Sequence, residues 1–400
     1  MINLERLASL FGIAIIIGFC ALISRDRKRI SWRLVAWGVG LQFGFALLIL
    51  KTGPGLKVFK FAEKVFAKLY DFTSIGVEFL TYKQLSEMNT AVSIGAVLVF
   101  VSSLMAVLYY LRVIQAFVYL FSKLMRYTMK ISGAEALASA FFVFMGIETV
   151  TAIKRYVGEM TRSELFTIMT AFMATIAGSV MVIYVGVFGA EAGHILAASI
   201  MSAPAAIMIS KILVPETGEP KTGAKIDWSE MKPEGSNVIE AAANGAADGM
   251  KLALTIVAML LAFVALIGML DFFLGKAGTS FRELSAYPLA PVAWLIGVPW
   301  EDCLDVGRLL GIKVIFNEFI SYQEMQQMAQ AGALSPRSIT IATYALCSFA
   351  NFGSLAILIG GIGGLAPERK NEVSGLGIKA LLAGFLAGLM TAAVAGILVR

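Results

Sequence analysis

The 400-residue sequence is poor in charge, because aspartate, glutamate, lysine and arginine together make up only 15% of it. Soluble domains carry about 25% of these residues. Hydrophobic residues make up 58%, and the mean hydropathy is +0.80. This composition excludes a soluble globular domain and predicts a protein that crosses a membrane several times. The net charge of +6 therefore does not indicate a nucleic-acid partner, since basic residues in such proteins mark the cytoplasmic side.

Cysteine and histidine are nearly absent. The cysteines lie far apart and form no CxxC pair, which excludes a disulfide framework and a cysteine zinc site: Cys20, Cys303 and Cys347. The only histidine, His194, follows a short loop and is assigned no role. No HExxH or GxSxG motif is present. An intramembrane hydrolase built on Glu148 and Glu318 would lack a nucleophile and a base, so no enzymatic activity is expected.

Long apolar runs make up most of the chain. A helix of about 20 apolar residues is long enough to cross a bilayer. Eight runs approach or exceed that length: 7–24, 33–50, 90–111, 165–188, 194–214, 251–273, 337–362 and 375–399. The first run is followed by charges and not by a small-residue cleavage site, so we expect no cleavable signal peptide. About eight transmembrane helices are predicted.

Basic residues indicate the orientation. They gather in RDRKRISWR at 25–33, after the third run, before the fourth, and between the last two. Placing these clusters in the cytoplasm puts both termini outside. The segment 131–156 must then begin and end on the cytoplasmic side, so it is predicted to enter the membrane and turn back.

Two segments are interrupted by polar residues at the middle of an apolar stretch. The segment 131–156 is broken at Gly146–Thr149, and 300–325 at Asn317–Phe319, which by the same charges enters from outside. Interrupted segments of opposite sense, one in each half, are typical of inverted-repeat transporters with a site at the bilayer midplane. We expect an all-α polytopic membrane protein with two re-entrant helical hairpins in an inverted-repeat arrangement.

The remaining segments complete the predicted domain organisation. Residues 54–71 carry apolar side chains on one face and lysines on the other. This pattern predicts an amphipathic helix that lies in the membrane interface or packs on a neighbouring span. The hydrophilic stretch 215–236 is expected to be a cytoplasmic linker. Four units follow: N-terminal spans and amphipathic helix, 1–88; scaffold span, first hairpin and first half of a transport core, 89–214; linker and amphipathic helix, 215–250; scaffold span, second hairpin and second half of the core, 251–400.

Glu148 and Glu318 are the strongest functional candidates. A carboxylate at membrane depth costs roughly 2.5–3.5 kcal/mol and is a functional hypothesis by default. Each could instead be paired structurally or lie nearer the interface. Ionised, they could accept hydrogen bonds from hydroxyl or N–H groups of a solute, or carry a coupling proton.

The stretch LCSFANFGSLAI, 346–357, places polar residues inside an apolar run. At helical spacing Ser348, Asn351 and Ser354 would share one face. They either join helices or bind a solute. Asn351 offers donors and acceptors that suit a neutral, hydroxyl-rich solute, and Phe349 could stack on a planar ring.

Several motifs resemble those of the concentrative nucleoside transporter family: PVAWLIGVPW, FNEF, ALCSFANFGS, IEAAANGA and TIAGSVM, from about residue 90 to 400. The resemblance implies a homotrimer in the plasma (inner) membrane, with eight membrane helices and two re-entrant hairpins. It implies secondary active import of nucleosides coupled to a cation gradient, H+ or Na+. The nucleoside would bind between the hairpin tips and two unwound helices, and a transport domain would move against a trimeric scaffold.

Site residues follow from the same motifs. By resemblance, Glu318 binds ribose hydroxyls, residues of SFANFGS contact base and ribose, Val180 lies near the base, and Glu148 is the acid of the first hairpin tip. The expected substrate-binding residues are Gly146, Ile147, Glu148, Val180, Asn317, Glu318, Phe349, Asn351 and Ser354. The family tip reads Gly-Gln-Thr/Ser/Asn-Glu, whereas this chain reads Gly146-Ile147-Glu148. An amide expected to read the base edge is missing, which leaves base selectivity open.

The coupling cation is open as well. Sodium-coupled members resemble one another in an Asn four residues before the tip glycine and a Ser before IAGS, where this chain has Phe142 and Thr175. Thr175 keeps a hydroxyl and Ile176 a carbonyl, but Phe142 cannot ligate a hard cation. Proton coupling through a carboxylate such as Glu148 and a weakened Na+ site both fit, and no other metal or cofactor is expected. The alternative function is an uncoupled channel or transporter for nucleosides or a related small polar solute.

Overall fold

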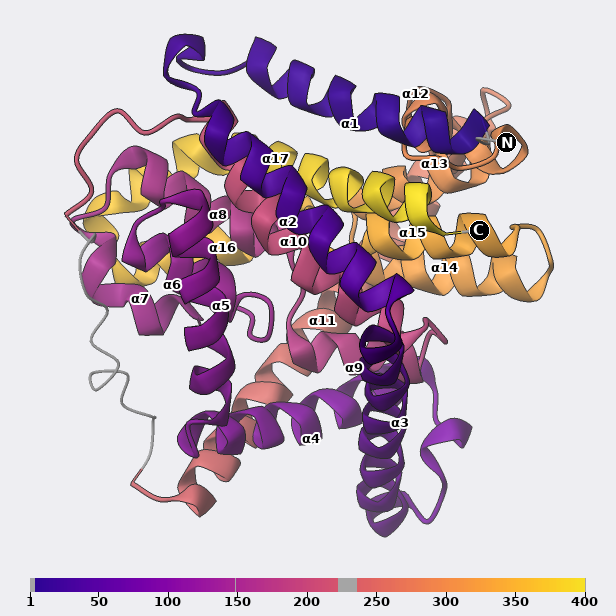
Figure 1. The fold of residues 1–400 in the computed structure, drawn as a ribbon. Helices are drawn as coiled ribbons and strands as arrows, with labels where there is room; N and C mark the ends of the chain where they lie inside the picture. The colour runs from indigo at the N-terminus through magenta and orange to yellow at the C-terminus, as the bar shows by residue number, and fades with distance from the viewer. Residues whose placement is uncertain (1–3, 148, 222–235, 400) are drawn as a thin grey trace.

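The computed structural model describes residues 4–147, 149–221 and 236–399 (Figure 1). All regular structure in these residues is helical, which confirms the predicted all-α class. The α-helices are, in chain order, α1 (Leu4–Leu22), α2 (Trp32–Lys51), α3 (Gly53–Thr81), α4 (Thr90–Tyr110), α5 (Val113–Met129), α6 (Gly133–Phe141), α7 (Thr149–Val157), α8 (Arg162–Ala174), α9 (Gly178–Gly186), α10 (Ala192–Leu213), α11 (Val238–Gly275), α12 (Phe281–Leu295), α13 (Cys303–Ile315), α14 (Glu318–Gln330), α15 (Pro336–Leu346), α16 (Phe352–Leu365) and α17 (Lys370–Leu398).

The centre of the molecule is formed by α8, α10 and α17, which contact one another (Figure 1). The apolar windows of α8–α9 and of α10 are each 89% buried, and that of α17 is 78% buried. By contrast, only 17% of the window of α11 is buried. An apolar helix exposed to this degree is typical of a surface that faces lipid or another chain in a membrane.

Close packing joins α4 and α11. A Cβ atom at Gly249 would lie 2.6 Å from the Leu98 carbonyl oxygen, and one at Gly245 would lie 2.7 Å from that of Ser102. The Ser103 hydroxyl donates to the Ala242 carbonyl oxygen at 2.9 Å. The spacing of the two glycines is the small-xxx-small pattern that lets membrane helices approach closely. This contact holds α11 beside the rest of the fold.

Both interrupted segments form pairs of helices that contact each other: α6 with α7, and α13 with α14. A capping box begins α6, because the Ser132 hydroxyl accepts from the Glu135 N–H and the Glu135 carboxylate accepts from the Ser132 N–H. The second break falls at Phe316–Asn317, directly before α14. Both breaks overlap the predicted positions, but the first already begins after Phe141, and in the second Glu318 and Phe319 belong to α14.

Two of the eight apolar runs are not continuous helices. The run 165–188 breaks between α8 and α9, and the run 337–362 breaks at 347–351 between α15 and α16. The Phe349 N–H donates to the Thr175 carbonyl oxygen at 3.1 Å. This hydrogen bond joins the two breaks and pairs a main-chain group of each that has no partner within its own helix. In the described residues seven stretches, with α8 and α9 counted as one, are long and apolar enough to span a membrane. The predicted count of about eight is not confirmed.

Other elements differ from the expected layout. α3 is much longer than the predicted 54–71, and of its predicted apolar face Phe61 is 67% exposed while Phe66 packs against the core. In Figure 1 its far end projects from the molecule. α11 is one continuous helix across the predicted boundary at 250. The helices α5 and α12 were not predicted, because α5 is amphipathic and α12 contains Pro288 and Pro291, which argue against a helix in the sequence.

Candidate functional site

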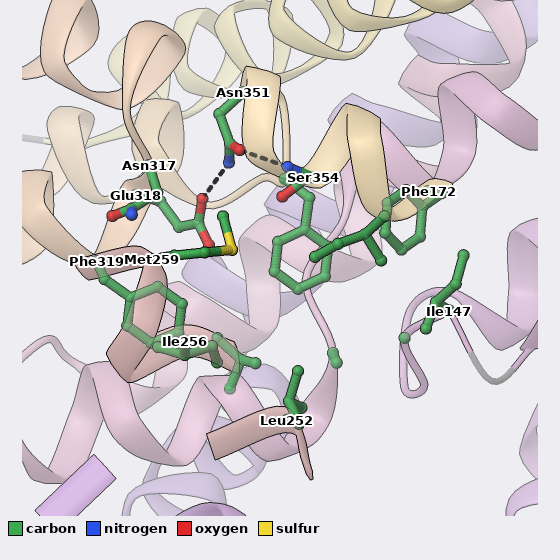
Figure 2. Close-up of a pocket in the computed structure, with 15 residues that line it drawn as sticks. Ile147, Phe172, Leu252, Ile256, Met259, Asn317, Glu318, Phe319, Asn351 and Ser354 are labelled. Atoms are coloured by element: carbon green, nitrogen blue, oxygen red, sulfur yellow. Dashed lines mark hydrogen bonds between the residues drawn. The ribbon is translucent and has the colours of Figure 1, made fainter. Parts of the chain in front are cut away.

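A pocket with about 620 Å³ of space between atoms, part of it open to solvent, lies where both helix pairs and both broken helices meet α11 (Figure 2). Residues from five parts of the chain line it: Gly146, Ile147, Phe172, Ala177, Val180, Leu252, Ile256, Met259, Asn317, Glu318, Phe319, Phe349, Asn351, Ser354 and Ile357. Figure 2 shows Glu318 and Asn351 on one side of the pocket and Ile147 on the opposite side.

Glu318 is the acidic centre of the described site and is only 2% exposed. The Asn351 side-chain amide donates to Glu318 Oε2 at 2.6 Å, and the Tyr184 hydroxyl donates to Glu318 Oε1 at 3.1 Å. Both carboxylate oxygens thus have a donor, as a buried charge requires. Glu318 begins α14, Asn351 directly precedes α16 and Tyr184 lies on α9, so the contact joins the two halves of the chain.

Helix N-termini position these groups. Asn317 caps α14 by accepting from the Ile320 N–H at 3.0 Å, and Asn351 caps α16 by accepting from the Ser354 N–H at 2.7 Å. The Glu318 carboxylate belongs to the first residue of α14, where the helix dipole favours negative charge. Breaking the two helices here therefore supplies both the polar side chains and an electrostatic environment that stabilises a carboxylate.

The other side of the pocket is apolar. The rings of Phe172 and Phe349 lie 5.5 Å apart with an interplanar angle of 35°. Leu252, Ile256 and Met259 of α11 form a further wall. A pocket with hydrogen-bonding groups at one end and aromatic and aliphatic side chains at the other suits a ligand with a polar part and a flat ring.

The structure gathers the expected substrate-binding residues around this one pocket. Those that line it are Gly146, Ile147, Val180, Asn317, Glu318, Phe349, Asn351 and Ser354. Glu148 lies outside the described residues. The expected cation residues Thr175 and Ile176 are fully buried in the break between α8 and α9, beside the pocket lining but not part of it.

The arrangement of 347–351 differs from the helical face predicted for this stretch. These residues are not helical, so Ser348 does not share a face with Asn351 and Ser354. Ser348 does not line the pocket, and its hydroxyl accepts from Lys313 Nζ at 2.6 Å. The apolar composition continues across the break, which is why hydrophobic periodicity does not reveal it.

Around Thr175 the oxygen atoms are engaged within the protein. Its hydroxyl donates to the Ala171 carbonyl oxygen at 2.8 Å, and its own carbonyl accepts from Phe349. Phe142 is buried, with its ring 5.6 Å from that of Phe172. Both Thr175 oxygens thus make a protein hydrogen bond and keep a lone pair, whereas Phe142 brings an aromatic ring and no oxygen.

Gly178 brings the first helix pair to the pocket. Its N–H donates to the Phe144 carbonyl oxygen at 2.9 Å, and a Cβ atom at this position would lie 2.8 Å from that oxygen. Only glycine permits this approach without a shift of the backbone. The glycine of the IAGS motif therefore fixes the turn that carries Gly146 and Ile147 against the start of α9.

Sequence reasoning missed Tyr184 and the apolar walls. Tyr184 lies in the run 165–188, where a phenol hydroxyl in otherwise apolar surroundings signals a buried partner. Phe172, Phe319 and the α11 residues carried no such signal, because apolar side chains are ordinary in a membrane helix.

Comparison with known families covers most of the chain. Residues 11–84 match the family model described as Na+ dependent nucleoside transporter N-terminus, and 194–396 match the corresponding C-terminus. Residues 91–191 match a model described as nucleoside recognition.

Individual proteins are similar over nearly the whole chain. Rat solute carrier family 28 member 3 is 38% identical over 98% of this chain, which spans 59% of that protein. The uncharacterized transporter YutK of Bacillus subtilis is 38% identical, with 98% of each chain covered. The solved structure of CNTnw in an inward-facing substrate-bound state matches with a TM-score of 0.92 at 36% identity, over 98% of each chain.

Proposed function

The chain belongs to the concentrative, or Na+ dependent, nucleoside transporter family, and we propose that it imports nucleosides through the described pocket by secondary active transport. The observation that carries the proposal is the pairing of Glu318 with Asn351 opposite the rings of Phe172 and Phe349. A nucleoside has the same division, with a hydroxylated sugar and a flat base.

The binding mode follows from the donors and acceptors present. A ribose hydroxyl donates to the Glu318 carboxylate, and the Asn351 amide turns from Glu318 to a second hydroxyl. The base lies between Phe349 and the α11 wall, with Val180 near it. Ile147 offers no hydrogen bond to the base, so discrimination between bases rests on shape and is weaker than an amide would provide.

For the coupling ion we propose a proton. Support comes from Phe142, whose side chain brings an aromatic ring and no oxygen to a position where a hard cation needs an oxygen ligand. A carboxylate of the site then carries the proton, and Glu318 and Glu148 are the candidates. This proposal departs from the sodium dependence in the name of the matched family model.

The membrane topology, the oligomeric state and the moving parts are proposed by analogy with the family. The pairs α6–α7 and α13–α14 are re-entrant hairpins of opposite sense, and both termini lie outside the plasma membrane. The chain forms a homotrimer in which the core around α8, α10 and α17 moves against a scaffold that includes α4 and α11. The low burial of α11 within one chain supports such a contact.

The test is uptake of radiolabelled uridine and adenosine into proteoliposomes under a proton or a sodium gradient, each imposed alone. Accumulation above equilibrium with the proton gradient alone is expected. Accumulation with sodium alone would refute proton coupling but keep symport. Uptake that only equilibrates would indicate an uncoupled transporter, and no uptake of either compound would refute nucleosides as the substrates.

A further inference from the structure

Lys313 on α13 is completely buried and takes no part in the pocket lining. Its ammonium group donates to the Ala345 carbonyl oxygen at 2.7 Å and to the Ser348 hydroxyl at 2.6 Å. It also lies 5.6 Å from the centre of the Phe385 ring. A buried ammonium is costly unless it is compensated, so this position requires an explanation.

The other fully described buried lysine shows what an ordinary compensation looks like. Lys211 forms ion pairs with Glu135 at 2.6 Å and with Glu216 at 3.2 Å. The hydrogen bonds of Lys313 instead go to a main-chain carbonyl and a hydroxyl, which are the ligands that a bound cation would use, and Glu318 is the acidic group that acts on it electrostatically. Its partners both belong to the end of α15 and the break that follows it.

The end of α15 is a place where a positive charge is stabilising. Ala345 is the next-to-last residue of this helix, and the last four carbonyl groups of a helix lack partners within it. The helix dipole also makes this end negative. The Lys313 ammonium therefore satisfies an open carbonyl and offsets the partial charge at the helix end.

Both segments that this contact joins continue directly to residues of the pocket. Phe349 follows Ser348 directly, and Asn351 comes three residues after it. Lys313 itself lies on α13, which leads through the break at Phe316–Asn317 to Glu318. The ammonium thus ties the segment that carries Asn351 to the helix pair that carries Glu318.

We propose that Lys313 is a resident cation that positions the 347–351 break, and with it Asn351 and Phe349, for nucleoside binding. In this half of the transporter a side chain takes the structural place that a bound metal ion could take at a helix break. Lys313 is a positioning residue, since it does not touch the pocket. The inference rests on the proposed function, because its readout is nucleoside affinity.

The test compares purified full-length variants in equilibrium binding of radiolabelled uridine and adenosine, with thermal unfolding measured without ligand. Lys313→Met keeps the length of the side chain and removes the charge, and we expect affinity to fall at least tenfold. Ser348→Ala removes one partner and should weaken binding less. Combining the two should lose no more than Lys313→Met alone, because both act through one contact.

Lys379→Met is the matched control. The Lys379 ammonium donates to the Leu213 carbonyl oxygen at 3.2 Å, at the end of α10 and away from the pocket lining. Nucleoside affinity should stay within twofold of wild type in this variant. A general effect of removing an ammonium from a helix end would weaken binding here as well and would overturn the proposal.

Each remaining outcome is decisive. Wild-type affinity in Lys313→Met, whatever its unfolding temperature, would reduce Lys313 to a stabilising residue. Where Lys313→Met does not fold, Ser348→Ala decides, and unchanged affinity there would overturn the proposal. Absence of nucleoside binding in the wild type would refute the proposed function first, and this inference with it.

Discussion

Asn351 makes two hydrogen bonds through different atoms of its side chain, and a variant that removes only one of them gives the sharpest test of the site. Its amide nitrogen donates to Glu318, and its amide oxygen caps α16 through the Ser354 N–H. A hydrogen bond to a charged group contributes about 1.5–3 kcal/mol, whereas an N-cap contributes about 0.5–2 kcal/mol to stability. Asn351→Ser keeps an oxygen that can cap the helix but removes the amide donor. Asn351→Ala removes both.

We therefore expect Asn351→Ser to weaken nucleoside binding roughly tenfold to a hundredfold, since each 1.4 kcal/mol is about tenfold. Its unfolding temperature should stay close to that of wild type. Asn351→Ala should lose uptake and also unfold at a lower temperature, while folded protein still reaches the membrane. The assay is nucleoside binding and uptake with thermal unfolding on the same preparations. Wild-type binding by Asn351→Ser would show that the amide donor of Asn351 has no part in recognition.

Three further changes test other parts of the structure. Tyr184→Phe removes one donor to Glu318 but keeps the ring packing. It should weaken nucleoside binding by about tenfold, which corresponds to one hydrogen bond of about 1.4 kcal/mol. Unchanged binding would show that the Tyr184 hydroxyl has no part in nucleoside recognition. Lys211→Met leaves the buried Glu135 carboxylate without its ion pair and should lower stability by about 3–5 kcal/mol in thermal or denaturant unfolding, and a loss below 1 kcal/mol would contradict this. Phe142→Asn supplies an amide oxygen where the family resemblance expects a sodium ligand, and it should make uptake respond to a sodium gradient; uptake indifferent to sodium would place the cation elsewhere.

The helix pairs were predictable because polar residues interrupt apolar runs at Gly146–Thr149 and Asn317–Phe319. Such interruptions are costly in a membrane and therefore visible in the sequence. The breaks at 175–177 and 347–351 are not visible in this way, because each run remains apolar enough to read as one span. Hydropathy measures composition, and it does not register a change of backbone direction that tertiary hydrogen bonds satisfy.

The polar residues of the site were predictable from the sequence. Glu318 and Asn351 stand out against apolar neighbours, and the family motifs added Val180 and the tip. The wall formed by α11 could not be found, since Leu252 and its neighbours resemble any lipid-facing residues of a long helix. Its part in the site depends on the packing of α11 against α4, which follows from the spacing of two glycines and not from any property of the lining residues themselves.

Each half has a pair of helices followed by a broken helix, but the two halves compensate the open carbonyl groups at the break in different ways. At the end of α15 the open carbonyl of Ala345 receives the Lys313 ammonium. At the end of α8 the Ala171 carbonyl receives the Thr175 hydroxyl, a neutral donor. A charged donor compensates the negative end of a helix, whereas a hydroxyl satisfies only the hydrogen bond. Within the part of the chain that the structure describes, a fixed positive charge thus lies at this helix end in one half and none lies at the corresponding end in the other. A metal ion that moves with the substrate is then expected to act in the first half, where Phe142 decides whether it can be held.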